Sequence, residues 1–276
     1  MRAFMRTKGK RMLLFLVVLL ISTVYIIPIL MMLLGSFKTQ GEALALDLSL
    51  PSHFEFQNYV HVIETGSILR GYMNSLIITV FSVVVILVGG ATTGILISRR
   101  RDKLSKGIYY YFIFGLTATM QTVTTYALIL KMGLYGSYVG VILVFVAINL
   151  PFAIMTFSSF VKGIPREIDE AAMIDGSGPF TLIFRILIPI MKPITITNLI
   201  IAAVGVWNNF MVPLYLMNSS AKMTIPMTVF NFYGLYARSW NYVFAALTIT
   251  VLPIVVLYLC LQKYIVEGMT AGAVKG

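Results

Sequence analysis

Charged side chains are scarce in this sequence: they make up 11% of the 276 residues, while 59% are hydrophobic and the mean hydropathy is +0.91. A water-soluble domain of this length could not stay in solution with such a composition, so we expect an integral membrane protein. Cys260 is the only cysteine, which excludes an internal disulfide or thiolate metal site and predicts a small core residue. The two histidines, His53 and His61, have no matching cysteine or carboxylate cluster. We therefore expect no metal site and no intramembrane catalytic site.

Acidic side chains are missing from the long apolar stretches, because the ten Asp and Glu residues all fall outside those stretches. An acidic residue within a membrane span usually marks an ion or proton pathway. Its absence disfavours a carrier driven by protons or sodium ions. The sequence also lacks a G-x-x-x-x-G-K-[ST] loop, which would hold nucleotide phosphates. The chain is therefore predicted to be neither an enzyme nor a cofactor-binding protein, and any transport must be driven from outside it.

Long apolar runs are what the sequence does contain. A helix needs about 20 apolar residues to cross a bilayer, and these runs are too long and unbroken for barrel strands, which alternate over about 10 residues. The predicted spans are residues 12–34, 72–97, 107–130, 138–160, 194–217 and 241–264. The fold class expected is an all-α integral membrane protein with six transmembrane helices, forming a single transmembrane domain over residues 1–276.

The basic residues predict how these spans are oriented. Of the 21 Lys and Arg residues, 16 lie before the first span, in loops 98–106 and 161–193, or at the C-terminal end, which contributes Lys263 and Lys275. Because basic segments stay in the cytoplasm, both termini are predicted to be cytoplasmic. This asymmetry accounts for most of the net charge of +11. No nucleic-acid partner is expected, since no soluble segment interleaves basic and aromatic residues.

The long inner loop, 161–193, has signals of local structure. Pro165 suits the first position of a helix, acidic residues follow in its first turn, and Gly176 can end it, which predicts a helix of about ten residues. Gly178 and Pro179 then restart the chain as a second short helix. Two short helices meeting at a glycine-rich corner make a protruding cytoplasmic element.

This inner loop has two interpretations on physical grounds alone. Ala171 and Ala172 are small enough for another backbone to approach closely, and Glu170 and Asp175 offer acceptors to basic partner groups. These features favour a docking element. An ordinary amphipathic surface loop would explain the same pattern.

The inner loop also carries a motif. Glu170, Ala171, Ala172, Asp175 and Gly176 resemble the EAA motif of binding-protein-dependent ABC importer permeases. The downstream I-x-L-P of that motif is similar to Ile186 through Pro189, with Ile188 at the position where Leu is usual.

The resemblance extends over nearly the whole chain and is closest to the maltose-type carbohydrate permeases of type I ABC importers. The other segments that carry it are Asn74-Ser75, Leu150-Pro151-Phe152, Trp207-Asn208-Asn209-Phe210 with Pro213, and the C-terminal residues 268–276. The sequence departs from the family at residues 120–125, which lack the prolines frequent there.

The resemblance implies a function for the assembly as well as for the chain. It implies the permease subunit of an ATP-driven sugar importer in the bacterial cytoplasmic membrane, of the multiple-sugar or raffinose kind. It implies a second permease, which we expect to be a different chain, a cytoplasmic ATPase dimer that binds ATP and magnesium, and an extracytoplasmic sugar-binding protein. Bilayer lipid would surround the spans.

The resemblance also implies roles for particular residues. The five EAA-motif residues would couple the chain to the ATPase, and within the cytoplasmic tail, 265–276, the contact residues would be Gly272, Ala273, Val274, Lys275 and Gly276. Within the outer loop, 218–240, the residues expected to contact the binding protein are Phe232, Tyr233, Tyr236 and Arg238, although an interfacial aromatic belt would also explain them.

Uncharged polar residues within the spans are the candidates for the substrate pathway, because sugar hydroxyls are matched by such groups. They are Gln121, Asn149, Asn208 and Asn209. Amide hydrogen bonds between helices would explain them equally. Gly89, Gly90 and Gly94 are candidates for an interface with the second permease, and a helix kink or internal packing would explain them equally.

Two other functions stay open from the sequence. An importer for another solute, such as glycerol phosphate, would need basic residues facing the pathway, and none is evident within the spans. A membrane enzyme or assembly scaffold could use the inner loop only to dock a partner.

Overall fold

The computed structural model describes residues 2–100, 102–117, 120–234 and 239–273, with side chains described from Lys10 to Gln262 inside those ranges. The chain divides into two compact units. Unit 1 comprises residues 1–69 and 228–251, and unit 2 comprises residues 70–227 and 252–276.

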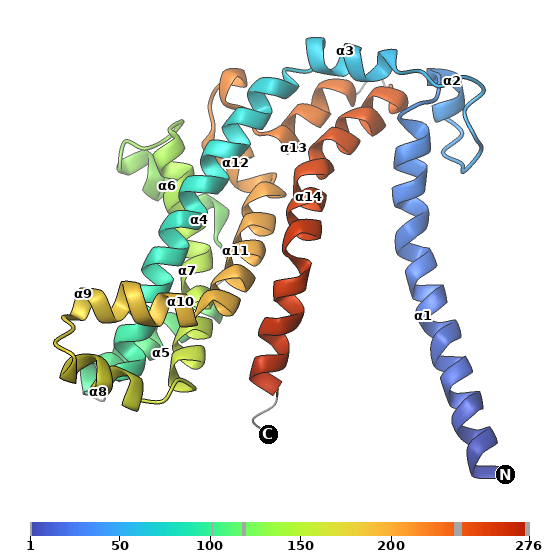
Figure 1. Cartoon of the computed structure of the whole chain (residues 1–276). Coiled ribbons are helices and arrows are strands. Elements are labelled where there is room, and N and C mark those ends of the chain that lie inside the picture. Colours follow the sequence, from blue (N-terminus) through green and yellow to red (C-terminus); the bar gives the residue numbers. More distant parts are fainter. Residues whose placement is uncertain (1, 101, 118–119, 235–238, 274–276) are drawn as a thin grey trace. The chain divides into compact units, whose positions relative to one another are not determined.

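Helices dominate the described residues of both units (Figure 1). In chain order they are α1 (Arg2–Gly35), α2 (Gln40–Ala43), α3 (Gln57–Thr65), α4 (Ile68–Arg99), α5 (Lys103–Thr117), α6 (Thr122–Lys131), α7 (Tyr138–Lys162), α8 (Glu167–Ile174), α9 (Pro179–Thr181), the π-helical turn η1 (Leu182–Leu187), α10 (Ile188–Ile190), α11 (Lys192–Trp207), α12 (Met211–Leu216), the 3₁₀ turn η2 (Ser220–Lys222), α13 (Ile225–Thr228), the 3₁₀ turn η3 (Val229–Phe232) and α14 (Trp240–Ala273). The prediction of an all-α membrane protein is confirmed.

Four of the predicted spans are continuous helices in the structure. Spans 12–34, 72–97, 138–160 and 241–264 fall within α1, α4, α7 and α14, each of which contains a segment long and apolar enough to cross a bilayer. Apolar side chains over such lengths favour the helix because all backbone polar groups then pair within one segment.

The other two predicted spans are not continuous helices. Span 107–130 is divided between α5, which ends at Thr117, and α6, which begins at Thr122. Span 194–217 is divided between α11, which ends at Trp207, and α12, which begins at Met211; between them, Asn209 Oδ1 accepts a hydrogen bond from the Val212 amide at 2.9 Å. A fifth crossing is reached only if Pro179–Ile190 and Lys192–Trp207, bent by 76°, count as one span. The six-span count remains a prediction.

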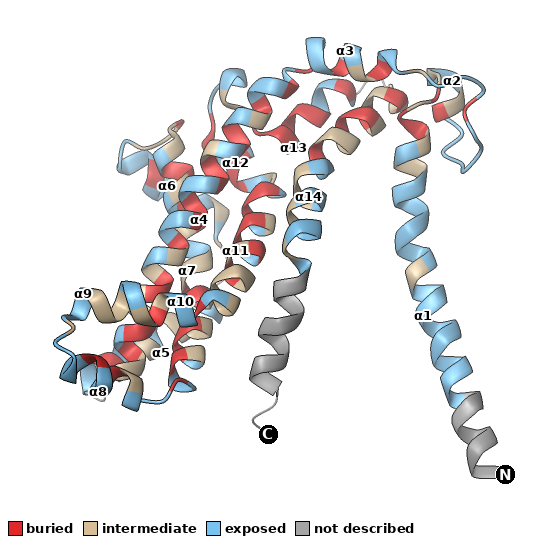
Figure 2. Ribbon diagram, in the orientation of Figure 1, coloured by how far each residue is buried: buried red, intermediate tan, exposed pale blue. Residues whose placement is uncertain are grey.

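The core of unit 2 lies where α4, α7 and α11 pack together, and Figure 2 shows the buried residues gathered on these helices. Gly90 and Gly94 of α4 permit this packing, because an added Cβ would lie 2.8 Å from Ala153 Cβ and 2.8 Å from Phe157 Cβ, respectively. Small residues at helix contacts allow close approach. Of the roles expected for these glycines, the structure shows internal packing at Gly90 and Gly94.

Unit 1 combines an exposed helix with a tightly hydrogen-bonded segment. The apolar residues of α1 are largely exposed along the helix (Figure 2). Beyond α1, Asn58 donates to the carbonyls of Ser36 and Lys38 at 2.9 Å each, and Asn241 donates to Asn58 Oδ1 at 2.8 Å. These bonds tie the start of α14 to the segment that follows α1.

Lys38 is the most buried charged residue of unit 1, with 1% of its surface exposed. Its ammonium donates to Asp47 Oδ1 at 2.6 Å, to the Asp47 carbonyl at 3.2 Å and to Ser49 Oγ at 3.0 Å. The hydrogen bonds from Lys38 and Ser49 lower the pKa of Asp47 from 3.8 to about 2. Hydrogen bonds from Ser52 and Thr39 likewise lower the pKa of Glu42 from 4.5 to about 2. Local charge pairing therefore shapes this segment.

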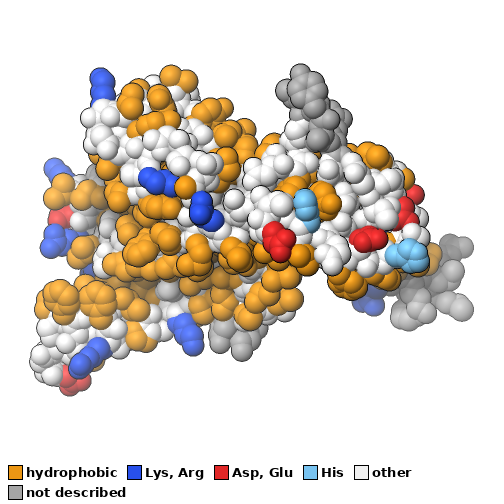
Figure 3. Space-filling view, turned by 90° about the horizontal axis from the view of Figure 1, so that it is seen from above, with side chains coloured by type: hydrophobic (Ala, Val, Ile, Leu, Met, Phe, Trp, Pro, Cys, Tyr) orange, Lys and Arg blue, Asp and Glu red, His pale blue; other side chains and the backbone are white. Residues whose placement is uncertain are grey.

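The surface is rich in exposed apolar side chains, as the space-filling view shows (Figure 3). Such a surface fits hydrocarbon contact rather than water. Cys260 belongs to this surface, because it is exposed on α14, so its prediction as a core residue is wrong. In a membrane helix apolar side chains occur on the exposed surface as well as in the core, and the sequence pattern did not separate these two positions.

Candidate functional site

The inner loop forms the two short helices that the sequence predicts. The first, α8, begins at Glu167 with three acidic residues in its first turn, where the helix dipole favours them. Pro165 therefore lies before the helix rather than at its first position. The second helical segment starts at Pro179, as predicted, and continues through η1 to Ile190.

Gly176 ends α8 in the way that its position predicts. Its φ is +77°, a left-handed conformation that a residue with a Cβ rarely adopts. The Ser177 amide donates to the Ala172 carbonyl at 2.9 Å, and the Gly176 amide donates to the Met173 carbonyl at 3.0 Å. This pair of bonds is a Schellman motif, which satisfies the last carbonyls of the helix and fixes the direction of the chain toward α9.

An ion pair fastens α8 to the end of α4. Arg99 Nε lies 2.7 Å from Asp169 Oδ2, and Arg99 Nη2 donates to Asp169 Oδ1 at 3.1 Å. Both side chains are nearly buried, at 16% and 10% exposed. Arg99 Nη1 also donates to the carbonyls of Val161 and Ile164 at 3.3 and 3.0 Å. A single guanidinium thus holds α4, the end of α7 and α8 in one geometry.

The outer surface of the loop is apolar and unprotected. Met173 and Ile174 of α8 are 61% and 86% exposed, and Phe180 is 79% exposed and stacks on Phe184 at 5.7 Å between ring centroids. We call these four residues the apolar tip. They present hydrophobic side chains on a short loop that hydrogen bonds hold in place.

The EAA-motif residues divide between this outer surface and the interior. Glu170, Ala171, Asp175 and Gly176 are exposed, whereas Ala172 is buried at 6% exposed. Ala172 faces unit 2 itself, so its small side chain serves the packing of α8 there. The prediction that all five residues act in coupling stays a prediction.

The segment from Pro179 to Ile190 leads from the apolar tip to α11. It includes the π-helical turn η1, and Leu187 in that turn is fully buried. Met191, also fully buried, follows, and α11 departs at 76° to the preceding segment. π-Helical turns within helices are frequent at functional sites. The tip is therefore connected to the helical core by a bent, well-packed joint.

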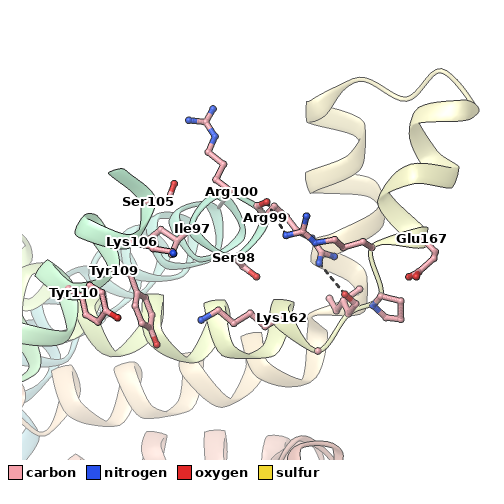
Figure 4. A pocket seen from close by; sticks show the side chains of 14 residues that line it. Ile97, Ser98, Arg99, Arg100, Ser105, Lys106, Tyr109, Tyr110, Lys162 and Glu167 are labelled. Carbon is pink, nitrogen blue, oxygen red and sulfur yellow. Dashed lines mark hydrogen bonds between the residues drawn. The ribbon is translucent and has the colours of Figure 1, made fainter. Parts of the chain in front are cut away.

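An open pocket of about 820 Å³ lies beside this loop (Figure 4). It is lined by residues 97–100 of α4, by Ser105, Lys106, Tyr109 and Tyr110 of α5, and by residues 162–167. Lys162 Nζ lies 4.6 Å from the centroid of the Tyr109 ring, a cation–π distance. The pocket is thus bounded by the same segments that Arg99 joins.

A second polar network lies at the other end of α4. Asn74 Nδ2 donates to the carbonyls of Ala221 and Met223 at 3.0 and 2.8 Å, and its Oδ1 accepts from the Tyr138 hydroxyl at 2.8 Å. The neighbouring Ser75 Oγ accepts from the Ile225 amide at 2.9 Å. The Asn74-Ser75 pair thereby fastens the segment around η2 and α13 to α4 and α7.

The outer-loop residues predicted for binding-protein contact are only partly described. Phe232 is buried in unit 1, with its ring 6.3 Å from His61 and 5.9 Å from Tyr242. Tyr233 is 38% exposed and meets Trp240 edge-on at 5.5 Å. Tyr236 and Arg238 lie outside the described residues. Of the four, the structure therefore places Tyr233 where a partner could reach it.

The predicted pathway residues are separated in the structure. Gln121 lines an open, mainly apolar pocket of about 740 Å³ between α5, α6 and α7, together with Thr124 and Thr125. Asn149 does not line that pocket, and its amide donates to the Phe145 carbonyl of its own helix at 2.8 Å. Asn208 and Asn209 occupy the break between α11 and α12. Two of the four thus end or begin helices.

The C-terminal tail residues lie at the limit of what the structure describes. Gly272 and Ala273 belong to the last turn of α14, and no side chain is described there. Val274, Lys275 and Gly276 lie outside the described residues.

Arg99, Asp169 and Asn74 are the residues whose structural role the sequence did not reveal. From the sequence, Arg99 is one of the basic residues that predict the orientation of the spans, and Asp169 is one of the acidic residues in the first turn of the predicted helix. Their pairing joins positions 70 residues apart, and a single sequence has no signal for such a contact. The lone polar pair Asn74-Ser75 at the start of an apolar run was a usable signal, since a buried amide needs partners.

Comparison with known proteins places this geometry in context. Residues 86–271 match the model of a family described as "Binding-protein-dependent transport system inner membrane component". The matched part includes α8, the apolar tip and the joint to α11.

The chain is also similar to other permease proteins along nearly its full length. It is 32% identical to the probable starch degradation products transport system permease protein AmyC of Thermoanaerobacterium thermosulfurigenes, covering 93% of this chain and 94% of that protein. It is 31% identical to the melibiose/raffinose/stachyose import permease protein MelC of Bacillus subtilis, covering 98% and 99%.

A solved structure shares the fold. A chain of a bacterial ABC transporter that imports the acidic polysaccharide alginate superimposes with a TM-score of 0.80, at 20% sequence identity, over 94% of this chain and 96% of that chain. At this identity the likeness concerns the fold alone.

Proposed function

The chain belongs to the family of binding-protein-dependent transport system inner membrane components, and from this premise we propose that it is the permease subunit of an ATP-driven carbohydrate importer. The family is one of transport subunits rather than catalytic ones. An oligosaccharide is the proposed substrate class, because relatives that match over 93% or more of this chain carry names of oligosaccharide import systems. Its place is the bacterial cytoplasmic membrane, which it crosses several times.

The observation that carries the proposal is the apolar tip on a fixed base. Arg99 and Asp169 hold α8 against α4 and α7, while Met173, Ile174 and Phe180 stay exposed. Exposed apolar side chains on a restrained element mark an interaction site, since little ordering entropy is lost on binding. We propose that the apolar tip inserts into a groove on a separate cytoplasmic ATPase. Glu170 and Asp175 would then face basic groups at the rim of that groove.

The proposed assembly has further parts. ATP and Mg²⁺ would be bound by the partner ATPase, used as a dimer because each permease offers one such loop. A second permease, proposed to be a different chain, would complete the translocation pathway. An extracytoplasmic sugar-binding protein would deliver the substrate, and Tyr233 with Tyr236 and Arg238 would contact it.

The pathway proposal is more limited. Gln121, with Thr124 and Thr125, supplies polar groups in an otherwise apolar pocket, which suits a sugar that needs few hydrogen bonds in passing. Asn208 and Asn209 mark a helix break, where backbone groups become available to a solute. The C-terminal residues 272–276 are proposed to reach the ATPase dimer.

Charge reversal at the exposed motif carboxylate tests the coupling proposal. Glu170→Lys should lower oligosaccharide uptake by about tenfold or more, because a docking loss of about 1.4 kcal/mol corresponds to tenfold. Substrate capture by the binding protein should be unchanged. The control is Glu64→Lys, an exposed reversal on α3. Uptake that stays intact in Glu170→Lys would favour a docking scaffold instead.

The substrate class is tested by growth on single carbohydrates after deletion of the gene. We expect loss of growth on at least one oligosaccharide, with restoration by the wild-type gene. Unchanged growth on every oligosaccharide would overturn the carbohydrate assignment. Stimulation of a co-purified ATPase by the loaded binding protein checks the assembly independently.

A further inference from the structure

The open pocket beside Arg99 has a charge pattern that coupling does not explain. Lys106 projects into it from α5 and Lys162 from the end of α7, and Figure 4 shows both near Tyr109. Within the described part of the chain, neither lysine forms an ion pair. The one carboxylate of the lining, on Glu167, lies at the opposite end of the pocket (Figure 4).

The pocket also contains hydrogen-bond donors suited to an anion. Arg166 lines the pocket and donates through Nη2 to the Arg99 carbonyl at 3.2 Å, which holds its guanidinium at the pocket wall. The buried Ser98 hydroxyl has no hydrogen-bond partner among the described residues. Two ammonium groups without a carboxylate partner among the described residues, together with additional donors, are the chemistry that binds a phosphate.

The surroundings of the pocket indicate where that phosphate comes from. On α5, Tyr110 and Tyr111 are 66% and 73% exposed, and Leu104 is 68% exposed. Leu104 and Tyr111 line a separate apolar groove of about 560 Å³ on the same helix. Exposed tyrosines beside a basic loop are typical of the membrane–water interface, where they lie at the level of lipid headgroups.

From these observations we propose that Lys106 and Lys162 bind the phosphate of an anionic phospholipid of the cytoplasmic leaflet. The acyl chains of that lipid would lie along the apolar groove formed by Leu104 and Tyr111. Basic pockets between membrane helices on the cytoplasmic side bind anionic headgroups in this way. Because Arg99 lines the pocket and also pairs with Asp169 of α8, the lipid would lie beside the inner loop.

Binding of defined lipids to the purified full-length chain in detergent tests this site. Phosphatidylglycerol should bind the wild-type chain more tightly than phosphatidylcholine. The double change Lys106→Gln with Lys162→Gln should weaken phosphatidylglycerol binding by about tenfold or more, because both cations at the headgroup are lost. The double change to arginine should retain it.

The control removes two charges elsewhere. Arg70→Gln with Lys131→Gln alters two exposed cations outside the pocket, and should leave phosphatidylglycerol binding within about twofold of wild type, since nonspecific attraction is small. Equal loss in this control, or no loss in the lysine pair, would overturn the site.

Soluble phosphates form the other arm of the experiment. Inorganic phosphate and ATP should compete with phosphatidylglycerol only weakly, because they have no acyl chains for the groove. If either binds as tightly as the lipid and depends on the same two lysines, the pocket is a soluble-phosphate site and the lipid proposal fails. Misfolding of the double variant would be recognised by the loss of its cooperative thermal unfolding transition in detergent. In that case the single change Lys106→Gln is measured instead, and phosphatidylglycerol binding as tight as that of the wild-type chain would overturn the site.

Discussion

Two ion pairs fix two segments of this chain, and they do so at different ranges. Lys38 and Asp47 are nine residues apart and close one segment of unit 1 on itself. Arg99 and Asp169 are 70 residues apart and join three helices of unit 2. Lys38 is buried while Asp47 is 50% exposed, whereas both Arg99 and Asp169 are nearly buried.

The difference suggests that the two pairs do different work. Loss of the Lys38 cation would return Asp47 to water, because half of that side chain already contacts solvent. Loss of Arg99 would leave Asp169 and two backbone carbonyls without their donor in the interior, which is the costly case. We therefore expect the first pair to shape a loop and the second to hold the base of the apolar tip.

The largest effect is expected from Arg99→Ala. Thermal unfolding in detergent should show a loss of about 2–4 kcal/mol, somewhat below the cost of breaking a fully buried pair. Uptake should fall by about tenfold or more, since α8 would no longer be held against α4. Asp169→Asn should be milder, because the amide oxygen still accepts a hydrogen bond.

The control for that change lies on the same helix. Arg70→Ala removes an exposed arginine of α4, and should change stability by about 0.5 kcal/mol or less. If Arg70→Ala and Arg99→Ala had the same effect, the long-range pair would have no special role.

A smaller effect is expected from Lys38→Met, which keeps the buried stem of the side chain but removes its charge. Stability should fall by about 1–2 kcal/mol through the lost hydrogen bonds. Hydrogen exchange should rise over residues 39–58, while uptake should change by less than about threefold, within the range of a modest local effect. A loss of uptake as large as that of Arg99→Ala would erase the contrast between the two pairs.

The smallest effect is a pH dependence confined to unit 1. The pKa of Asp47 is lowered from 3.8 to about 2, so its ionised form is favoured in the folded chain. The stabilisation is present above the ordinary pKa and is lost as the pH falls through the window from 3.8 to about 2. The protection factors of residues 39–58, which are exchange rates corrected for the intrinsic pH dependence of amide exchange, should therefore be constant between about pH 5 and 8 and fall below about pH 4.

Asp47→Asn provides the comparison for this titration. It should reduce the acid step without abolishing it, because Glu42 has a pKa of about 2 and titrates in the same range. An unchanged acid step in Asp47→Asn would show that the Lys38 pair does not stabilise the segment.

The sequence predicts helices well and their continuity poorly. The length of the apolar runs identified α1, α4, α7 and α14, because a helix that crosses the hydrocarbon needs about 20 consecutive apolar residues. It missed the breaks at residues 208–210 and between Thr117 and Thr122. Asn209 shows why, since one amide that accepts a backbone hydrogen bond beside the break changes the mean hydropathy of a whole span very little.

The candidate site was predictable where its signals are local. Gly176 ended α8 as expected because a left-handed residue is written into the sequence as glycine. Ala172 looked like a contact for a partner, yet it faces inward, since a motif gives residue types and not the side of a short helix. Arg99 and Asp169 could not be paired, because their contact depends on how α4 and α7 pack.

The 76° bend at Met191 has a mechanical consequence. The helical segment from Pro179 to Ile190 is about 18 Å long at about 1.5 Å per residue, so it would act as a lever arm that pivots near Met191. A force applied at Phe180 across the axis of α11 would produce torque on that helix rather than pushing it along its length. A small displacement at one end would thereby become a rotation of the helix that carries Asn208 at its far end.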